Sequence, residues 1–152
     1  MQFQVEAWSN ALPELRKLFP LLWNEVALDK DKLRSECNEE LYANMENMNM
    51  LHLVTARSGP LLVGYHLSFI TPHMHYKGAG SMAFTDMYFT LPTFRKGGLG
   101  AKLLCFLEQS LRERGIVKAY LSHKVAHDRK ALFEALGWKH CDAVYSKYLG
   151  AK

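Results

Sequence analysis

The spacing of apolar residues predicts a strand and then a helix at the start of the chain. Phe3, Val5 and Ala7 alternate with polar residues, which is typical of a strand with one buried face. Asn10 follows as a candidate N-cap, and Pro20 should kink or divide the helix, because proline cannot donate the intrahelical hydrogen bond. The apolar positions of this helix are Leu12, Leu15, Leu18, Leu22 and Val26.

A second amphipathic helix is expected in the same part of the chain. Its apolar positions, three or four residues apart, are Leu33, Cys37, Leu41, Met45 and Met48. Asp31 and Glu36 lie toward its N-terminal part, where a carboxylate interacts favourably with the helix dipole. The chain therefore begins with a strand and two helices.

In the middle of the chain the residue pattern changes from the spacing of helices to one typical of strands. Three segments, residues 51–57, 60–70 and 81–91, are rich in β-branched and aromatic side chains. Turn residues separate them at Ser58-Gly59 and again at 77–80. This pattern predicts an antiparallel meander of three strands.

Helical spacing returns after Gly98 and ends at Gly115, which is placed as a C′ glycine. The buried face of this helix should carry Leu99, Leu103, Leu107 and Leu111. A strand at 116–123, a helix at 127–137 and one or two closing strands at 138–149 complete the pattern.

Length and composition fit a single globular domain. The 152 residues are 49% hydrophobic and 22% charged, which is ordinary for a soluble protein with one core. We expect one domain over residues 1–152, of the α/β (α+β) class, with a mixed but mostly antiparallel sheet. Its element order should be β-α-α-β-β-β-α-β-α-β(β).

Charge and cysteine content narrow the function classes. A net charge of +4 and a pI near 9.0 would suit nucleic acid, but the basic residues are scattered and interrupted by acidic ones, which favours a solvated surface. The opening MQFQVEAW lacks the pattern of a secretory signal, and no apolar run approaches the roughly 20 residues that cross a bilayer. Three separated cysteines argue against a disulfide framework or a zinc site. We expect a cytoplasmic protein with no membrane partner.

The stretch RKGGLGAKLL joins a predicted strand to a predicted helix and is a candidate anion site. Its glycines allow positive φ and close approach of a ligand, and the first N–H groups of the helix have no partner within it. Arg95, Lys96 and Lys102 add positive charge. The plain alternative is a tight turn with solvated cations. Neither the Walker A pattern nor G-x-G-x-x-G fits these residues.

The same residues match the acyl-CoA pattern of the Gcn5-related N-acetyltransferases (GNAT), [QR]-x-x-G-x-[GA], which reads Arg95-Lys96-Gly97-Gly98-Leu99-Gly100 here. The flanks in YFTLPTFRKGGLGAKLL and the later ALFEALGW also resemble this family, over roughly residues 51–149. HKVAHDRKALFEALGW is similar to small acetyltransferase-like proteins of bacteriophage genomes.

The resemblance implies a co-substrate and a place for it. In this family two central strands splay apart, pantetheine lies in the gap, and the glycine loop holds the pyrophosphate of acetyl-CoA. Here the first splayed strand would be residues 81–91, with pantetheine on its main chain and the pyrophosphate on the amides of residues 96–101. The implied cofactor-binding positions are Tyr88, Thr90, Arg95, Lys96, Gly97, Gly98, Leu99, Gly100 and Ala101.

Asp86 is the candidate general base, because it is a lone carboxylate within the apolar run MAFTDMYF. A buried carboxylate needs hydrogen bonds, and a raised pKa would suit a base that works through water. By strand alternation it should share a face with Phe84, Tyr88 and Thr90. The alternative is a structural carboxylate satisfied by a backbone N–H or by a lysine.

The general acid is less clear, because many family members have a tyrosine where this chain has Phe133, which has no proton to give. Substitutes near the second splayed strand and the following helix are Ser122, His123 and His127, and Tyr145 would come from a closing strand. Water is another donor. Each histidine also fits a surface or helix-start position.

These features predict an enzyme that transfers an acetyl group from acetyl-CoA to an amine by direct attack on the thioester. The acceptor is open: a small molecule, a peptide or a protein. One alternative is a catalytically idle CoA-binding protein that acts by binding a partner, and a weaker one is a nucleic-acid-binding module. We expect no metal, since His73 and His75 lack a third ligand nearby in sequence, and a homodimer stays open.

Overall fold

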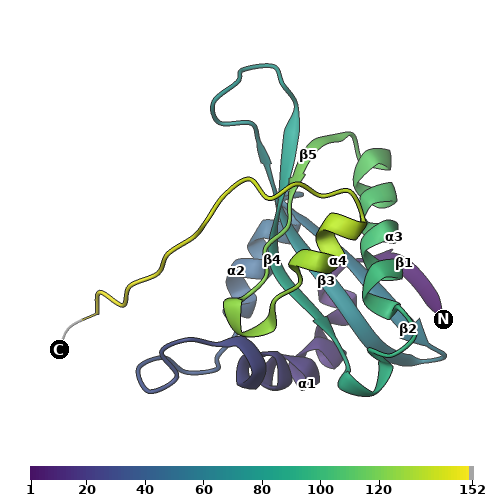
Figure 1. Ribbon diagram of the computed structural model, residues 1–152, viewed down its shortest axis with the longest axis vertical. Coiled ribbons are helices and arrows are strands. Elements are labelled where there is room, and N and C mark those ends of the chain that lie inside the picture. The colour runs from purple at the N-terminus through teal and green to yellow at the C-terminus, as the bar shows by residue number, and fades with distance from the viewer. Residues whose placement is uncertain (151–152) are drawn as a thin grey trace.

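The computed structural model describes residues 1–150 and is built on one five-stranded sheet (Figure 1). The strands follow chain order across the sheet; the first four are antiparallel, and the fifth is parallel to the fourth. They are β1 (Gln2–Glu6), β2 (Leu51–Ser58), β3 (Leu61–Pro72), β4 (Ser81–Thr90) and β5 (Ile116–Tyr120). The predicted mixed α/β fold and the three-strand meander are confirmed.

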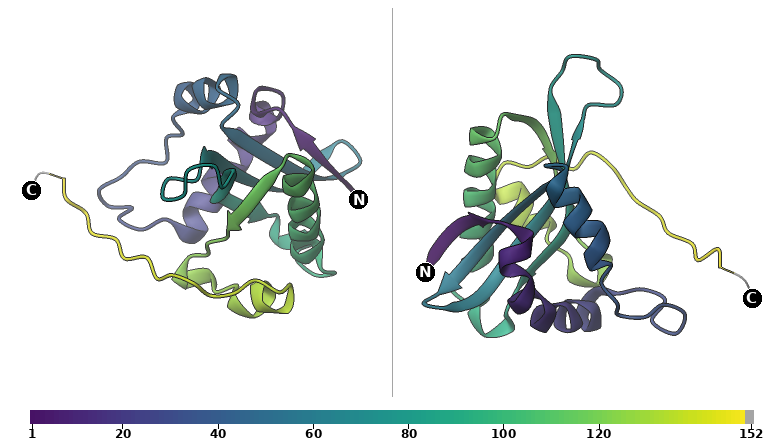
Figure 2. Two further views of the ribbon diagram at one scale, coloured as in Figure 1. Left: turned by 90° about the horizontal axis from the view of Figure 1, so that it is seen from above. Right: turned by 180° about the vertical axis from the view of Figure 1, so that it is seen from behind.

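Helices cover both faces of the sheet (Figures 1 and 2). One face carries α1 (Trp8–Val26) and α2 (Glu39–Asn47), and the other carries α3 (Leu99–Glu113) and α4 (Lys130–Ala135). Two short 3-10 turns, η1 (Pro92–Phe94) and η2 (Val125–His127), precede α3 and α4. Among residues 1–150, no helix combines the length and the apolar character needed to span a bilayer.

The apolar pattern of the sequence becomes two packed layers, one on each side of the sheet. On the α3 face, Leu103, Leu104 and Leu107 are fully buried against β2, β3 and β4. On the other face, Trp8 and Leu15 of α1 pack on Tyr65 and neighbouring side chains. Full burial of one such side chain contributes about 2 kcal/mol, so these layers hold the helices in register with the strands.

Helix α1 runs without interruption through Pro13 and Pro20, so the expected division at Pro20 is wrong. It also begins earlier than predicted, at Trp8, with Ala7 in the N-cap position instead of Asn10. Tertiary packing explains both differences, because the buried stripe of the helix starts at Trp8 and outweighs the two lost backbone hydrogen bonds.

Helix α2 is shorter than predicted and begins after Asn38. The Asn38 side chain accepts a hydrogen bond from the Leu41 amide (3.1 Å), and Glu39 and Glu40 follow in the first turn. Leu33 and Cys37 therefore lie outside the helix, in the connection from α1. The helical spacing of these two residues was misleading, since a strong N-cap starts the helix one turn later.

The predicted closing strands at 138–149 are not formed. This segment leaves α4 and runs away from β5 (Figures 1 and 2), with Val144 and Tyr145 at 90% and 92% exposure. Alternating side chains make a strand only when a neighbouring strand supplies hydrogen bonds and cross-strand packing. Here the segment does not lie along the β5 edge, so the alternation has no partner.

Candidate functional site

Strands β4 and β5 pair only at their beginnings and then diverge. Their register covers Ser81 to Phe84 on β4 and ends at Tyr120 on β5. At the point of divergence the Thr85 hydroxyl donates to the Tyr120 carbonyl (3.1 Å). Among the residues that the structure describes, 1–150, no strand lies beside the later residues of β4, up to Thr90, on the β5 side. This is the splayed geometry that the sequence resemblance implied.

The hydroxyl of Thr85 is held from the other side by His66 of β3, whose Nε2 lies 3.1 Å away. Because Thr85 Oγ1 donates to the Tyr120 carbonyl, it accepts from His66, which requires a hydrogen on Nε2. The Ser68 hydroxyl lies 3.3 Å from the other ring nitrogen. Burial lowers the pKa of His66 to about 3, so the ring is neutral and acts as a structural brace at the divergence.

A β-bulge in β4 decides where Asp86 points. Leu67 pairs with Met87 and Ser68 pairs with Thr85, so Asp86 is the extra residue. Its carboxylate accepts a hydrogen bond from the Tyr42 hydroxyl of α2 (2.6 Å).

The bulge breaks the expected alternation along β4. Tyr88 and Thr90 lie toward α3, whereas Asp86 lies on the α2 face together with Phe84. The prediction that Asp86 shares a face with Tyr88 and Thr90 is therefore wrong, and the part that concerns Phe84 holds. One extra residue in a strand moves every later side chain to the opposite face.

The surroundings of Asp86 favour a carboxyl group that is hard to ionise. Burial raises its pKa above the usual value, and the hydrogen bond from Tyr42 and the charge of Lys124 offset part of that shift. The Cys37 thiol is also nearby: burial, Glu39 and Asp86 raise its pKa to about 11, so it is neutral. Asp86 therefore holds a proton more readily than an exposed aspartate, which suits a general base.

The glycine turn before α3 presents unpaired backbone donors. Gly97 and Gly98 have φ of 100° and 76°, values that favour glycine, and a Cβ at either position would meet nothing within 4 Å. Within residues 1–150 the amides of residues 96–101 donate no hydrogen bond. No side chain caps α3, and no acidic residue stands in its first turn, so the positive end of the helix dipole is free for an anion.

A cavity of about 170 Å³ adjoins this turn and the end of β4. It is lined by Tyr88, Thr90, Arg95, Gly98, Gly100, Ala101, Arg129 and Leu132. The structure thus brings together six of the positions that the sequence assigned to the cofactor. Gly100 has a steric role, since a Cβ there would lie 2.5 Å from the Tyr88 hydroxyl. Arg129 was not predicted; its signal was a pair of cations, Arg129 and Lys130, at the start of the last helix.

Arg95 has a different role from the one its charge suggested. Its Nη2 lies 2.7 Å from both carboxylate oxygens of Glu25 in α1, and its Nε donates to the Thr90 carbonyl (3.0 Å). The guanidinium therefore joins α1, the end of β4 and the glycine turn. Lys96 and Lys102 are exposed and leave their charge free for solution or ligand.

The candidate acids belong to different parts of the C-terminal third of the chain. Ser122 is exposed after β5, and His127 is half-buried in η2, which packs against α1. His123 Nε2 lies 3.4 Å from Asp128. Tyr145 does not reach the site: without a closing strand it is 92% exposed in the C-terminal segment, which overturns its expected placement.

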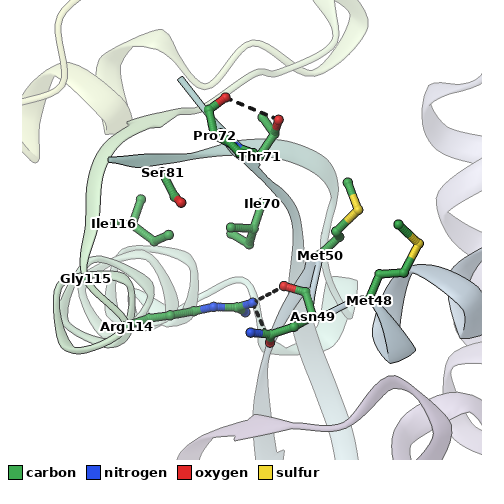
Figure 3. A pocket seen from close by; sticks show the side chains of 10 residues that line it. All are labelled: Met48, Asn49, Met50, Ile70, Thr71, Pro72, Ser81, Arg114, Gly115 and Ile116. Atoms are coloured by element: carbon green, nitrogen blue, oxygen red, sulfur yellow. Dashed lines mark hydrogen bonds between the residues drawn. The ribbon is translucent and has the colours of Figure 1, made fainter. Parts of the chain in front are cut away.

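A second cavity, of about 280 Å³, lies at the opposite end of β4, where Ser81 begins the strand (Figure 3). Arg114 enters it, but Nη2 donates to the carbonyl and the side-chain oxygen of Asn49 (2.6 and 2.9 Å), and Nη1 donates to the Leu51 carbonyl. This arginine closes the turn between α2 and β2, so both of its Nη nitrogens are occupied.

Known proteins match the chain in both sequence and structure. The sequence model of the acetyltransferase (GNAT) family matches residues 12–138. No curated protein matches the chain. An aminoglycoside acetyltransferase from an uncultured soil metagenomic sample is similar in structure, with a TM-score of 0.72, 19% identity, and coverage of 99% of this chain and 96% of that one.

Two further solved structures have the same fold. A predicted acetyltransferase from Clostridium acetobutylicum, solved with acetyl-CoA, gives a TM-score of 0.69 at 18% identity and covers 97% of this chain and 96% of its own. Glucosamine-6-phosphate N-acetyltransferase from Arabidopsis thaliana gives a TM-score of 0.66 at 16% identity and covers 99% of this chain and 100% of its own. Since the family match spans most of the sequence and the splayed strands and glycine turn are in place, the chain belongs to the GNAT acetyltransferase family, whose co-substrate is acetyl-CoA.

Proposed function

We propose that the protein transfers the acetyl group of acetyl-CoA to a primary amine. Asp86 takes a proton from the ammonium form of the acceptor through water, and the free amine attacks the thioester carbonyl. The new C–N bond forms, the C–S bond breaks, and CoA leaves as a thiolate that is then protonated. The products are an N-acetylated amine and free CoA.

One observation carries the proposal: unpaired amides at the start of α3 lie beside the gap where β4 leaves β5. A pyrophosphate on residues 96–101 would direct pantetheine along the free edge of β4 toward the bulge. The bulge leaves one residue of β4 without a partner, so its N–H is a suitable donor to the oxyanion of the tetrahedral intermediate. Arg129 would add charge across the phosphate cavity.

For the thiolate proton we propose His127, with Ser122 or water as substitutes. His127 is half-buried, and Lys124, one turn earlier, is close enough to affect the pKa of Asp86. This supports a position for the His127 turn near Asp86. Phe133, in the position of the usual tyrosine, is buried at 8% exposure and supplies no proton.

For the acceptor we propose a small polar amine. Structurally similar proteins are named for aminoglycosides, one of them in complex with sisomicin, and for glucosamine 6-phosphate. A half-buried carboxylate at the bulge suits a primary ammonium group on a compact molecule. Peptide amines belong in the same test panel.

The idle CoA-binding alternative keeps one argument in its favour, the phenylalanine at position 133. It predicts the same affinity for CoA and no free thiol with any acceptor. A measurement of turnover therefore distinguishes the two functions.

The first experiment is calorimetric titration with acetyl-CoA and CoA, followed by thiol detection with amino sugars, polyamines and peptides. Gly98→Ala should weaken CoA binding at least tenfold. Gly115→Ala is the matched control, because its φ of 78° and its open surroundings equal those of Gly98, but it lies at the other end of α3. Equal loss in both variants would count against the phosphate site, and binding without thiol release would favour the idle alternative.

A further inference from the structure

The hydrogen bond between Tyr42 and Asp86 joins two elements that are far apart in sequence. The hydroxyl lies 2.6 Å from the carboxylate oxygen, and 44 positions separate the residues. Because a carboxylate accepts and a hydroxyl donates, this bond stabilises the ionised form of Asp86. The bond is also directional, so it selects one rotamer of a side chain at a bulge.

The ring of Tyr42 is itself held firmly. It stacks on Trp8 with 4.5 Å between ring centroids, and the ring of Phe69 in β3 is stacked near it at 6.2 Å. Glu46, one turn later in α2, accepts from the backbone amides of Trp8 and Ser9, the latter at 3.2 Å. This carboxylate replaces the N-cap side chain that Ala7 cannot provide. Helix α2 is thus bound to the start of α1, and these contacts hold the Tyr42 ring in place.

We infer that Tyr42 is a positioning residue for acetyl transfer: its hydroxyl aims the Asp86 carboxylate and sets the pH above which that carboxylate can act as a base. This inference rests on the proposed role of Asp86. It adds to that role a residue of α2, an element outside the glycine turn and outside the second family landmark.

Four groups surround Asp86 and bear on its ionisation. Tyr42 donates to it from α2, and Lys124 attracts its negative charge from the segment before η2. Cys37 and Tyr65 are neutral, since burial and the charge of Asp86 raise the pKa of each. Burial opposes ionisation most strongly, so the Tyr42 bond is the main local contact that favours the charged form.

Loss of the Tyr42 hydroxyl should raise the pKa of Asp86. Without the hydroxyl, the carboxylate loses a donor while it stays buried, so its pKa rises. The base is then protonated over a wider range, and the acidic limb of the rate profile moves to higher pH. A shift of about one pH unit is expected for one hydrogen bond to a charged group.

The test compares Tyr42→Phe with Tyr65→Phe. Both remove one phenol hydroxyl from the same apolar layer and keep the ring; Tyr42 is half-buried and Tyr65 is buried, but the Tyr65 hydroxyl has no hydrogen-bond partner within residues 1–150. The readout is the carboxyl stretch of protonated Asp86 in the infrared spectrum as a function of pH, isolated by subtracting the spectrum of Asp86→Asn. This readout needs no acceptor.

We expect the midpoint of that band to rise by about one pH unit in Tyr42→Phe and to stay in place in Tyr65→Phe. With an acceptor in hand, the acidic limb of kcat/KM should move by the same amount. An unchanged midpoint in Tyr42→Phe, or an equal shift in both variants, overturns the inference. If Asp86→Asn keeps full activity, the proposed base is wrong, and the infrared midpoint still decides whether Tyr42 controls Asp86.

Discussion

The two halves of the candidate site are built in different ways. The glycine turn consists of consecutive residues, 96–101, and offers its backbone amides to a ligand. These amides are exposed by the conformation of the glycines and do not depend on particular side chains. The Asp86 cluster combines side chains from α2, β3, β4 and the segment before η2. Local geometry makes the first half, and packing makes the second. Mutations should therefore affect the cofactor and the chemistry separately.

The largest expected effect is on the chemistry alone. Asp86→Asn removes the proposed base with almost no change in volume, so turnover should fall about 100-fold or more, whereas the affinity for CoA stays unchanged. Steady-state kinetics and calorimetry measure the two quantities. A parallel loss of CoA affinity would show that the two halves are coupled.

The next effect tests what holds the glycine turn against α1 and the end of β4. Arg95→Met breaks the pair with Glu25 and the bond to the Thr90 carbonyl, so the free energy of unfolding should fall by about 2 kcal/mol. Urea titration measures it. Lys96→Met is the control, because that side chain is exposed and has no ion pair within residues 1–150, and it should leave stability unchanged. If the two variants behave alike, Arg95 is an ordinary surface cation.

A smaller effect is expected on the cofactor half alone. Arg129→Gln keeps a polar side chain at the wall of the cavity but removes its charge, so CoA should bind roughly tenfold more weakly. The loss should shrink at high salt, since screening already weakens the same attraction. A loss that does not depend on salt would point to shape instead of charge.

The smallest effect concerns the start of α2. Asn38→Ala removes the side-chain acceptor for the Leu41 amide and should cost about 1 kcal/mol of stability. Thermal unfolding measures the loss, with Asn44→Ala, inside the same helix, as the comparison. If the cap also fixes the position of Tyr42, the pH titration of Asp86 will broaden in Asn38→Ala and stay unchanged in Asn44→Ala.

Much of the architecture was predictable because it depends on neighbours in sequence. The strands of the meander, the leucine face of α3 and its ends at Gly98 and Gly115 follow from period and from residues that tolerate positive φ. The predictions for Pro20, Leu33 and the closing strands were wrong. The buried stripe of α1 kept the helix intact at Pro20, and the Asn38 cap started α2 after Leu33. The closing strands did not form because no neighbouring strand pairs with that segment within residues 1–150.

The candidate site divides along the same line. The sequence by itself determined the glycine turn, since the φ values and free amides of residues 97–101 arise within one turn of chain. Only the tertiary structure decided that a bulge turns Asp86 toward Tyr42, 44 positions away, and that Arg95 is held by Glu25, 70 positions away. Strand register and side-chain partners depend on how distant segments pack, so a local sequence pattern does not predict them.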